Sequence, residues 1–256
     1  SFIKCLHLIP LTETWEEGEF ETDVATTTED VEQIVDEAFP EGRVEFLPMG
    51  PSESLRLSLD FFGAAPLRFG GVHPNCETAT YLLSDGERYR PLSDYLKRPL
   101  EDVAQDWVSR AEKLDVKLAR LDSDKWFQKW RGRLLVIRTF AGLMVRVLDT
   151  KRLLRGNRFL AVARILGGVM TGKRLKDQLR KHTNVQSAML MVVLPFEEYH
   201  SVESARLEGC PSGFAYEDPQ TGAVKTVPVC MWGLYKNDIQ RKIAEKYQAA
   251  AVAGSS

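Results

Sequence analysis

The chain has 256 residues, of which 44% are hydrophobic and 27% are charged, and its formal net charge is −2. This composition indicates a globular protein with enough apolar material for one large domain or two small ones. The longest apolar runs are shorter than the ~18 residues that a membrane-spanning helix needs, and we recognise no secretory signal at the start of the chain. We therefore expect a cytoplasmic protein, and the strand-like beginning without Met predicts a fragment of a longer one.

The N-terminal quarter predicts a strand followed by a helix. Residues 2–11 read as a buried strand with Cys5 in the core, because a cytosolic cysteine is most often a small buried residue. After an acidic loop, residues 28–39 carry apolar residues at helical spacing and acidic residues in the first turn. Thr27 or Thr28 is the expected N-cap.

The middle of the chain predicts a hairpin and then a series of helices. Residues 53–62 could form a strand or a short helix, while residues 80–92 predict a hairpin around Asp85 and Gly86. Residues 100–121 and several segments up to about residue 181 carry the helical period. Expected helix breaks are Gly142, Gly156, Gly167 and Gly168.

The last third returns to strands. Residues 188–196 are apolar throughout, as in a central strand, and a short helix should follow at residues 202–207. We expect Glu197 and Glu198 to lie in solvent at the start of that helix. A hairpin with the turn "EDPQTG" then separates Cys210 from Cys230, and a turn centred near Gln220 would bring the two thiols together.

The cysteines allow more than one interpretation. Besides Cys5, the chain has Cys76, Cys210 and Cys230, each close to a proline. A reducing compartment disfavours a disulfide, which leaves metal binding and plain burial as the alternatives. No CxxC pair supports zinc. Of the histidines, only His73, three residues before Cys76, has a plausible ligand partner. The segment "GGVMTGKR" is rejected as a phosphate-binding loop, because an arginine replaces the hydroxyl residue and no strand precedes it.

The charges are unevenly distributed. Residues 13–53 contain fourteen acidic residues and one basic one, whereas residues 129–182 contain fifteen lysines or arginines and two acidic residues. Apolar residues recur at helical spacing in the basic segment, so it is either a cover helix with solvated arginines or a phosphate-binding surface. The candidate anion contacts are Arg131, Arg138, Arg146 and Lys151.

A family resemblance extends over nearly the whole chain. The ordered segments "FLPMGPSESL", "HPNCETATYLL", "MLMVVLPFEEY", "ARLEGC" and "VPVCMWGLYKNDIQRKIAEKY" resemble the C-terminal half of radical SAM proteins of the tetraether lipid synthase and dihydropterin methylase-like group. The family's further cysteine before the H-P-x-C corner is not present in "PLRFGGV", and the chain lacks the C-x-x-x-C-x-x-C motif of the catalytic cluster.

The resemblance implies that Cys76, Cys210 and Cys230 ligate an auxiliary iron–sulfur cluster, of the 4Fe-4S type. It implies S-adenosylmethionine in the full-length enzyme, an electron donor, and radical attack on a C–H bond of a lipid-like or pterin-like substrate. It also favours an anionic membrane surface over nucleic acid as the partner of the basic helices. No catalytic acid or base can be named. The alternative is a non-enzymatic anion- or membrane-surface-binding protein with structural cysteines.

The expected fold class is α/β: the terminal strand–helix part of a partial β/α barrel, then a helical cover and a small α+β region that bears the cysteines. The expected regions are the end of the barrel (1–62), a strand region with the HPNC corner (63–99), a basic helical cover (100–187), the strand, helix and hairpin with Cys210 and Cys230 (188–248), and a disordered tail (249–256).

Overall fold

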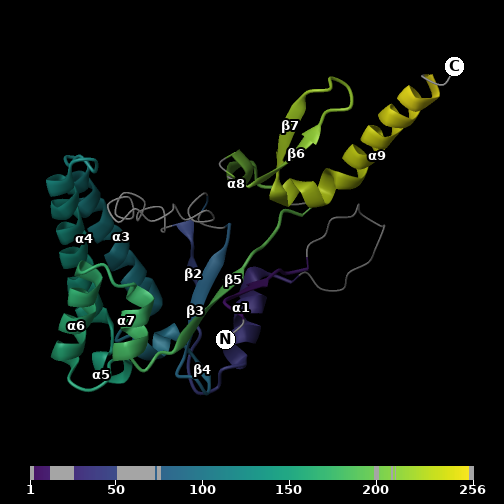
Figure 1. The fold of residues 1–256 in the computed structure, drawn as a ribbon. Helices are drawn as coiled ribbons and strands as arrows, with labels where there is room; N and C mark the ends of the chain where they lie inside the picture. The colour runs from purple at the N-terminus through teal and green to yellow at the C-terminus, as the bar shows by residue number, and fades with distance from the viewer. Residues whose placement is uncertain are drawn as a thin grey trace.

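The computed structural model describes residues 3–11, 26–50, 73, 76–198, 202–208, 210 and 212–253. A mixed five-stranded sheet occupies the middle of the molecule, and a two-stranded antiparallel sheet lies near the C-terminus (Figure 1). The expectation of a mixed α/β fold is confirmed at this level. The strands are β1 (Cys5–Leu8), β2 (Leu47–Pro48), β3 (Thr78–Ser84), β4 (Tyr89–Pro91), β5 (Ser187–Val193), β6 (Gly213–Glu217) and β7 (Val224–Pro228).

The apolar strand β5 is central, as its sequence predicted. It pairs in parallel with β1 and antiparallel with β3, while β2 and β4 share the opposite edge of β3. Met191, Val192 and Val193 of β5 are buried. The hairpin expected around Asp85 and Gly86 is formed by β3 and β4, and residues 53–62 lie outside the described residues.

Strand β1 exists, but the prediction that it is buried was wrong. Among the described residues it pairs only with β5, so it is an edge strand, and Cys5 is exposed rather than in the core. The apolar run alone could not distinguish an edge strand from a central one, because that depends on which strands pair. Only Leu8 of this strand packs against the buried cluster below the sheet.

The predicted first helix is α1 (Thr28–Glu37). Thr27 is its N-cap and forms a capping box with Asp30, in which each side chain accepts a hydrogen bond from the other residue's backbone N–H. Val35 of this helix packs against Leu82 of β3 and Met191 of β5. The helix thereby covers one face of the sheet and buries its core.

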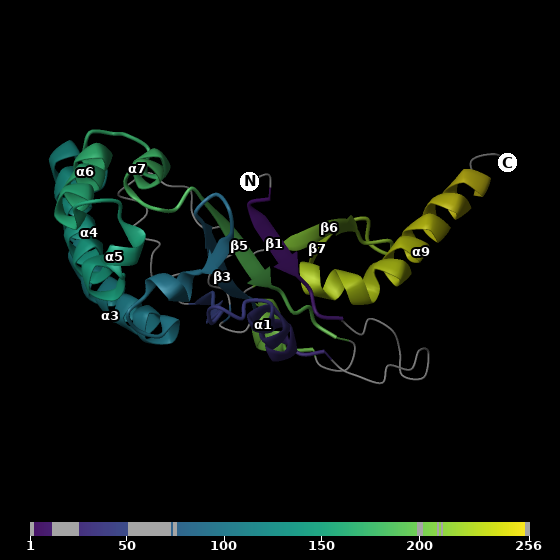
Figure 2. The ribbon, with the colours of Figure 1, turned by 90° about the horizontal axis from the view of Figure 1, so that it is seen from below.

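Helices between residues 100 and 182 form what we call the helical arm (Figures 1 and 2). Besides α1, the described helices are the 3-10 turn η2 (Leu92–Tyr95), α3 (Leu100–Leu118), α4 (Trp126–Val147), α5 (Thr150–Leu153), α6 (Arg158–Met170), α7 (Leu175–His182), α8 (Ser204–Glu208) and α9 (Val229–Ala253). In α3 and α4, which lie side by side, Leu114, Leu118 and Val136 form one buried cluster, and the Trp107 and Phe140 ring centroids are 4.5 Å apart.

The expected glycine breaks are only partly correct. Gly156 lies between α5 and α6 with a positive φ of 66°, as a break requires, but Gly142 is inside α4, and Gly167 and Gly168 are inside α6. A glycine within a helix costs only about 1 kcal/mol relative to alanine, which the buried apolar contacts of a long helix outweigh.

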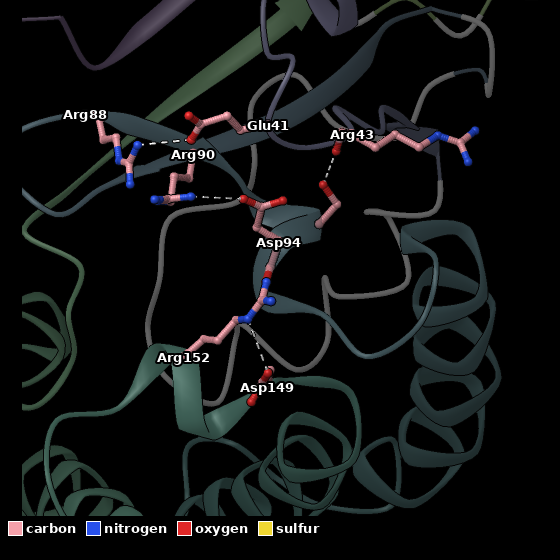
Figure 3. Close-up of polar contacts among 8 residues, drawn as sticks. Glu41, Arg43, Arg88, Arg90, Asp94, Asp149 and Arg152 are labelled. Carbon is pink, nitrogen blue, oxygen red and sulfur yellow. Dashed lines mark hydrogen bonds and ion pairs between the residues drawn. The ribbon is translucent and has the colours of Figure 1, made fainter.

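The helical arm is joined to the sheet through η2 and α5 (Figure 3). The Arg152 guanidinium of α5 donates a hydrogen bond of 3.1 Å to the Asp94 carbonyl of η2 and lies 3.7 Å from the Asp149 carboxylate. The Asp94 carboxylate lies in turn 3.7 Å from Arg90 of β4. An isolated backbone bridge between Leu96 and Leu148 completes the junction.

The C-terminal hairpin packs on α9. The Phe214 and Trp232 rings stack with centroids 5.2 Å apart, and the Tyr247 hydroxyl donates a hydrogen bond of 2.6 Å to Glu217. Helix α9 and the helical arm extend from the sheet in opposite directions in Figures 1 and 2, and α9 continues through Ala253. Among the described residues, no helix combines the length and apolar character that a membrane crossing needs.

Candidate functional site

Cys210 and Cys230 lie at the open end of the C-terminal hairpin. The register pairs Gly213 with Pro228, so Cys210 comes just before β6 and Cys230 lies in the first turn of α9, directly after β7. The Val229 backbone N–H donates to the Ser212 carbonyl at 3.0 Å and closes this end. The two thiols are close enough for the charge of one to affect the ionisation of the other.

The two thiols have different surroundings. The Cys210 thiol donates a hydrogen bond to the Ser212 carbonyl, with 3.2 Å between the sulfur and the oxygen. Burial raises the pKa of the Cys230 thiol above its ordinary value, and a hydrogen bond donated by the Glu197 backbone N–H together with the Arg206 charge partly opposes this rise. Both are free thiols in this structure. Deprotonation of Cys230, which ligation of a metal requires, is therefore disfavoured until a cation compensates the charge.

A buried ion pair lies next to Cys230. The Glu197 side chain is 1% exposed, that of Arg206 is 11% exposed, and Arg206 Nε lies 3.1 Å from Glu197 Oε1. The other carboxylate oxygen accepts a hydrogen bond of 2.8 Å from the Glu203 N–H, and Arg206 Nη2 donates one of 2.7 Å to the Pro195 carbonyl. The expectation of a solvated Glu197 was wrong, because this side chain ties α8 to the segment after β5.

Cys76 is connected to the surroundings of Glu197 through His73. The Cys76 backbone N–H donates to the His73 carbonyl at 3.0 Å, and His73 Nε2 lies 3.9 Å from Glu203 Oε1. His73 therefore contacts the residue whose backbone holds Glu197. Across the described residues, however, no three His, Cys, Asp or Glu side chains converge closely enough to hold one metal ion. Cys210 and Cys230 flank the same end of the β6–β7 hairpin, and Cys76 lies outside that hairpin, just before β3.

The predicted anion contacts are divided among three places on the helical arm. Arg138 and Arg146 line a cavity of about 500 Å³ between α3 and α4, and Lys151 lines a second cavity of about 380 Å³ beside α6. Arg131 is exposed and belongs to neither lining. The first cavity is also lined by three cations of α3 that the sequence analysis did not identify, although their helical spacing puts them on one face: Arg110, Lys113 and Lys117.

No protein-family model matches the chain, and no curated protein matches it closely enough to indicate a relationship.

Proposed function

We propose that the chain is the C-terminal part of a radical SAM enzyme that acts on C–H bonds of a lipid-like or pterin-like substrate, and that Cys76, Cys210 and Cys230 hold an auxiliary iron–sulfur cluster. The observation that carries the proposal is the position of Cys210 and Cys230, which flank the same open end of the β6–β7 hairpin. The Cys76 turn supports it, because His73 lies beside Glu203, and the Glu203 backbone N–H donates to the carboxylate of Glu197, the residue next to Cys230.

The fold is compatible with the proposed partial barrel. Strand β1 leads into α1, and β1 and β5 are parallel, as neighbouring strands of a β/α barrel are. Within the described part of the chain, β1 pairs on one side only, which leaves its other edge for a further strand. Strand β3 runs antiparallel to β5, so under this proposal it belongs to the cysteine-bearing region and not to the barrel.

The ligand set only partly fits a cluster. A bound cluster would supply thiolate-ligated iron for electron transfer or substrate binding. Ligation by all three thiols would require them to converge more closely than they do here. What the chain itself does is hold the two hairpin thiols in place, through the buried Glu197–Arg206 pair and the hydrogen bonds around Ser212.

The test is cluster loading of the full chain with a matched cysteine control. Anaerobic reconstitution with iron and sulfide should give a brown protein with visible charge-transfer absorption and bound sulfide. Serine at position 76, 210 or 230 should lower the bound iron, whereas Cys5→Ser should not, since Cys5 lies on the exposed edge strand. A colourless protein, or an equal loss in all four variants, would refute the proposal.

A specific observation also favours contact with a membrane surface. At the beginning of α4, Trp126 is 75% exposed, Phe127 is 64% exposed and Trp130 is 46% exposed. Lys129 and Arg131 lie in the same two turns. Exposed aromatic rings beside cations are typical of segments that lie in the interface of an anionic bilayer. We infer that this end of the helical arm rests on an anionic bilayer, in either the enzyme or a non-enzymatic binding protein.

Co-sedimentation with vesicles tests this contact. Binding to vesicles that contain phosphatidylglycerol should fall with salt and should be lost when Trp126 and Phe127 are both replaced by serine. Replacement of Phe159, which is 74% exposed on α6, by serine is the matched control and should leave binding unchanged. Equal binding to neutral vesicles, or equal loss in the control, would contradict the inference.

A further inference from the structure

The cavity between α3 and α4 has an unusual lining. Five of its nine lining residues are cationic, and none is acidic: Arg110, Lys113, Lys117, Arg138 and Arg146. Like charges at helical neighbour spacing, such as Lys113 and Lys117, destabilise a helix. The clustering of five cations around one cavity therefore favours the binding of an anion in it.

Few carboxylates neutralise these cations within the part of the chain that the structure describes. Asp106 interacts electrostatically with Arg110 and Arg146, but it is hydrogen-bonded to Arg98. No described carboxylate lies within 4.0 Å of Lys113, Lys117 or Arg138. The positive charge of the cavity is thus largely available to a ligand.

A glycine lines the cavity and leaves open space there. Gly142 lies in its lining, and a Cβ atom added there would meet no heavy atom within 4 Å. The remaining uncharged lining consists of leucine and threonine side chains. A volume of about 500 Å³ lies within the range of small-molecule sites. A methyl group at position 142 would therefore fit without contact, whereas a larger side chain would occupy part of the cavity.

The spacing of the cations indicates the form of the anion. Arg110 and Lys117 are seven residues apart, which is roughly 10 Å along a helix, and Arg138 and Arg146 are roughly 12 Å apart. An anion whose phosphate groups are spread along such a row can pair with the cations at both ends at once, which a compact anion does less well. We propose that this cavity binds an elongated anion with two or more phosphate groups, provided either by a soluble polyphosphate compound or by phospholipid headgroups. This site is separate from the cysteines and does not depend on the iron–sulfur proposal.

Calorimetric titration of the full chain with sodium tripolyphosphate tests the site, with sodium sulfate at equal ionic strength as the reference. Tripolyphosphate should bind at one site, at least about tenfold more tightly than sulfate, because several charge-assisted contacts form at once. The Arg138→Gln/Arg146→Gln double variant should weaken this binding at least about tenfold. The double variant Lys173→Gln/Arg174→Gln, on the exposed loop between α6 and α7, is the charge-matched control and should bind as the unmodified chain does.

Two variants of Gly142 test whether binding requires the space inside the cavity or only the positive charge around it. Gly142→Leu fills the hollow and keeps all five cations, so it should weaken binding as strongly as the arginine variant; Gly142→Ala should leave binding nearly intact. Both residues favour helices, and far-UV circular dichroism verifies folding. Unchanged binding by a folded Gly142→Leu chain, or no preference for tripolyphosphate over sulfate, would overturn the proposal.

Vesicles distinguish the two phosphate sources. If headgroups are the ligand, sedimentation with phosphatidylglycerol vesicles should be reduced by Gly142→Leu and by competing tripolyphosphate. If the ligand is a soluble compound, tripolyphosphate should bind, but neither Gly142→Leu nor added tripolyphosphate should change the sedimentation with vesicles. Either result supports a phosphate site in the cavity, and failure of the chain to bind tripolyphosphate or these vesicles would overturn it.

Discussion

Glu197 and Arg206 form an ion pair that is almost completely removed from solvent, with 3.1 Å between Oε1 and Nε. Neither of these two atoms makes a hydrogen bond within the described residues. The attraction between the charges is therefore their main compensation for lost hydration. The pair also joins α8 to the segment that follows β5, directly beside Cys230.

Glu197→Gln should strongly destabilise the fold. The substitution keeps the shape of the side chain but leaves the Arg206 charge buried without a counter-ion, which costs about 3–5 kcal/mol. Denaturant unfolding monitored by circular dichroism measures the loss. The double variant Glu197→Gln/Arg206→Met should recover part of it, because no uncompensated charge then remains.

The control for this prediction is another pair of opposite charges. Asp238 and Arg241 form an ion pair on α9 in which both side chains are more than half exposed. Asp238→Asn should change the free energy of unfolding by less than about 1 kcal/mol. A similar small effect of Glu197→Gln would show that the buried pair contributes no more than a surface pair.

This ion pair illustrates where sequence reasoning reached its limit. The β3–β4 hairpin and the capped helix α1 were predictable, because an Asp-Gly turn and a Thr N-cap each depend only on residues a few positions apart in the sequence. The burial of Glu197 was not predictable, since it depends on the ion pair with Arg206, and only the tertiary fold brings these two residues into contact. The exposure of Cys5 likewise depends on strand pairing.

The two candidate sites show the same limit. The hairpin symmetry around Gln220 was enough to expect Cys210 and Cys230 near each other, because antiparallel register is a local property. The position of Cys76 depends on contacts far apart in the sequence. The cationic cavity required the pairing of α3 with α4, which no pattern within either helix specifies.

The cysteines should differ in their reaction with iodoacetamide. Cys5 is exposed, whereas Cys230 is partly buried and burial raises its pKa. Because the thiolate is the reactive form, Cys5 should be alkylated before Cys230, and the rate at Cys230 should still increase between about pH 7.5 and about pH 9. Mass spectrometry of peptides from timed reactions measures both rates. Faster alkylation of Cys230 at the lower pH would contradict the burial of this thiol.

Asp218 should make the C-terminal hairpin sensitive to acid. A hydrogen bond from Lys225, assisted by the backbone N–H groups of Gln220 and Thr221, lowers the pKa of Asp218 from 3.8 to about 2. A lowered folded-state pKa contributes stability that is fully present above the unfolded value of 3.8 and is lost as the pH falls through about 2. The difference in Tm between the unmodified chain and Asp218→Asn should therefore shrink on acidification from about pH 5 to about pH 2.

Lys225→Met provides the second arm of this prediction. Without the ammonium group, the largest cause of the shift is gone, so the pKa of Asp218 should rise towards its ordinary value. Carbon-detected NMR titration of the carboxyl group measures the midpoint in both proteins. Equal midpoints would show that Lys225 does not hold this carboxylate.

Gly42→Ala should destabilise the junction between the sheet and the helical arm. A Cβ atom at position 42 would lie 2.5 Å from Asp94 Oδ1, and the Asp94 carboxylate cannot move away without lengthening its contact with Arg90 (Figure 3). Overpacking of this kind costs about 1–3 kcal/mol. In the Gly42→Ala/Asp94→Ala double variant the added methyl group no longer meets a carboxylate, so the cost of Gly42→Ala should largely disappear.

The control is Gly142→Ala on α4, where the added Cβ meets no heavy atom within 4 Å. This substitution should instead stabilise the chain by up to about 1 kcal/mol. Thermal and denaturant unfolding of these variants, of the unmodified chain and of Asp94→Ala as the reference for the double variant measure these differences, and equal effects at positions 42 and 142 would show that Asp94 does not constrain Gly42.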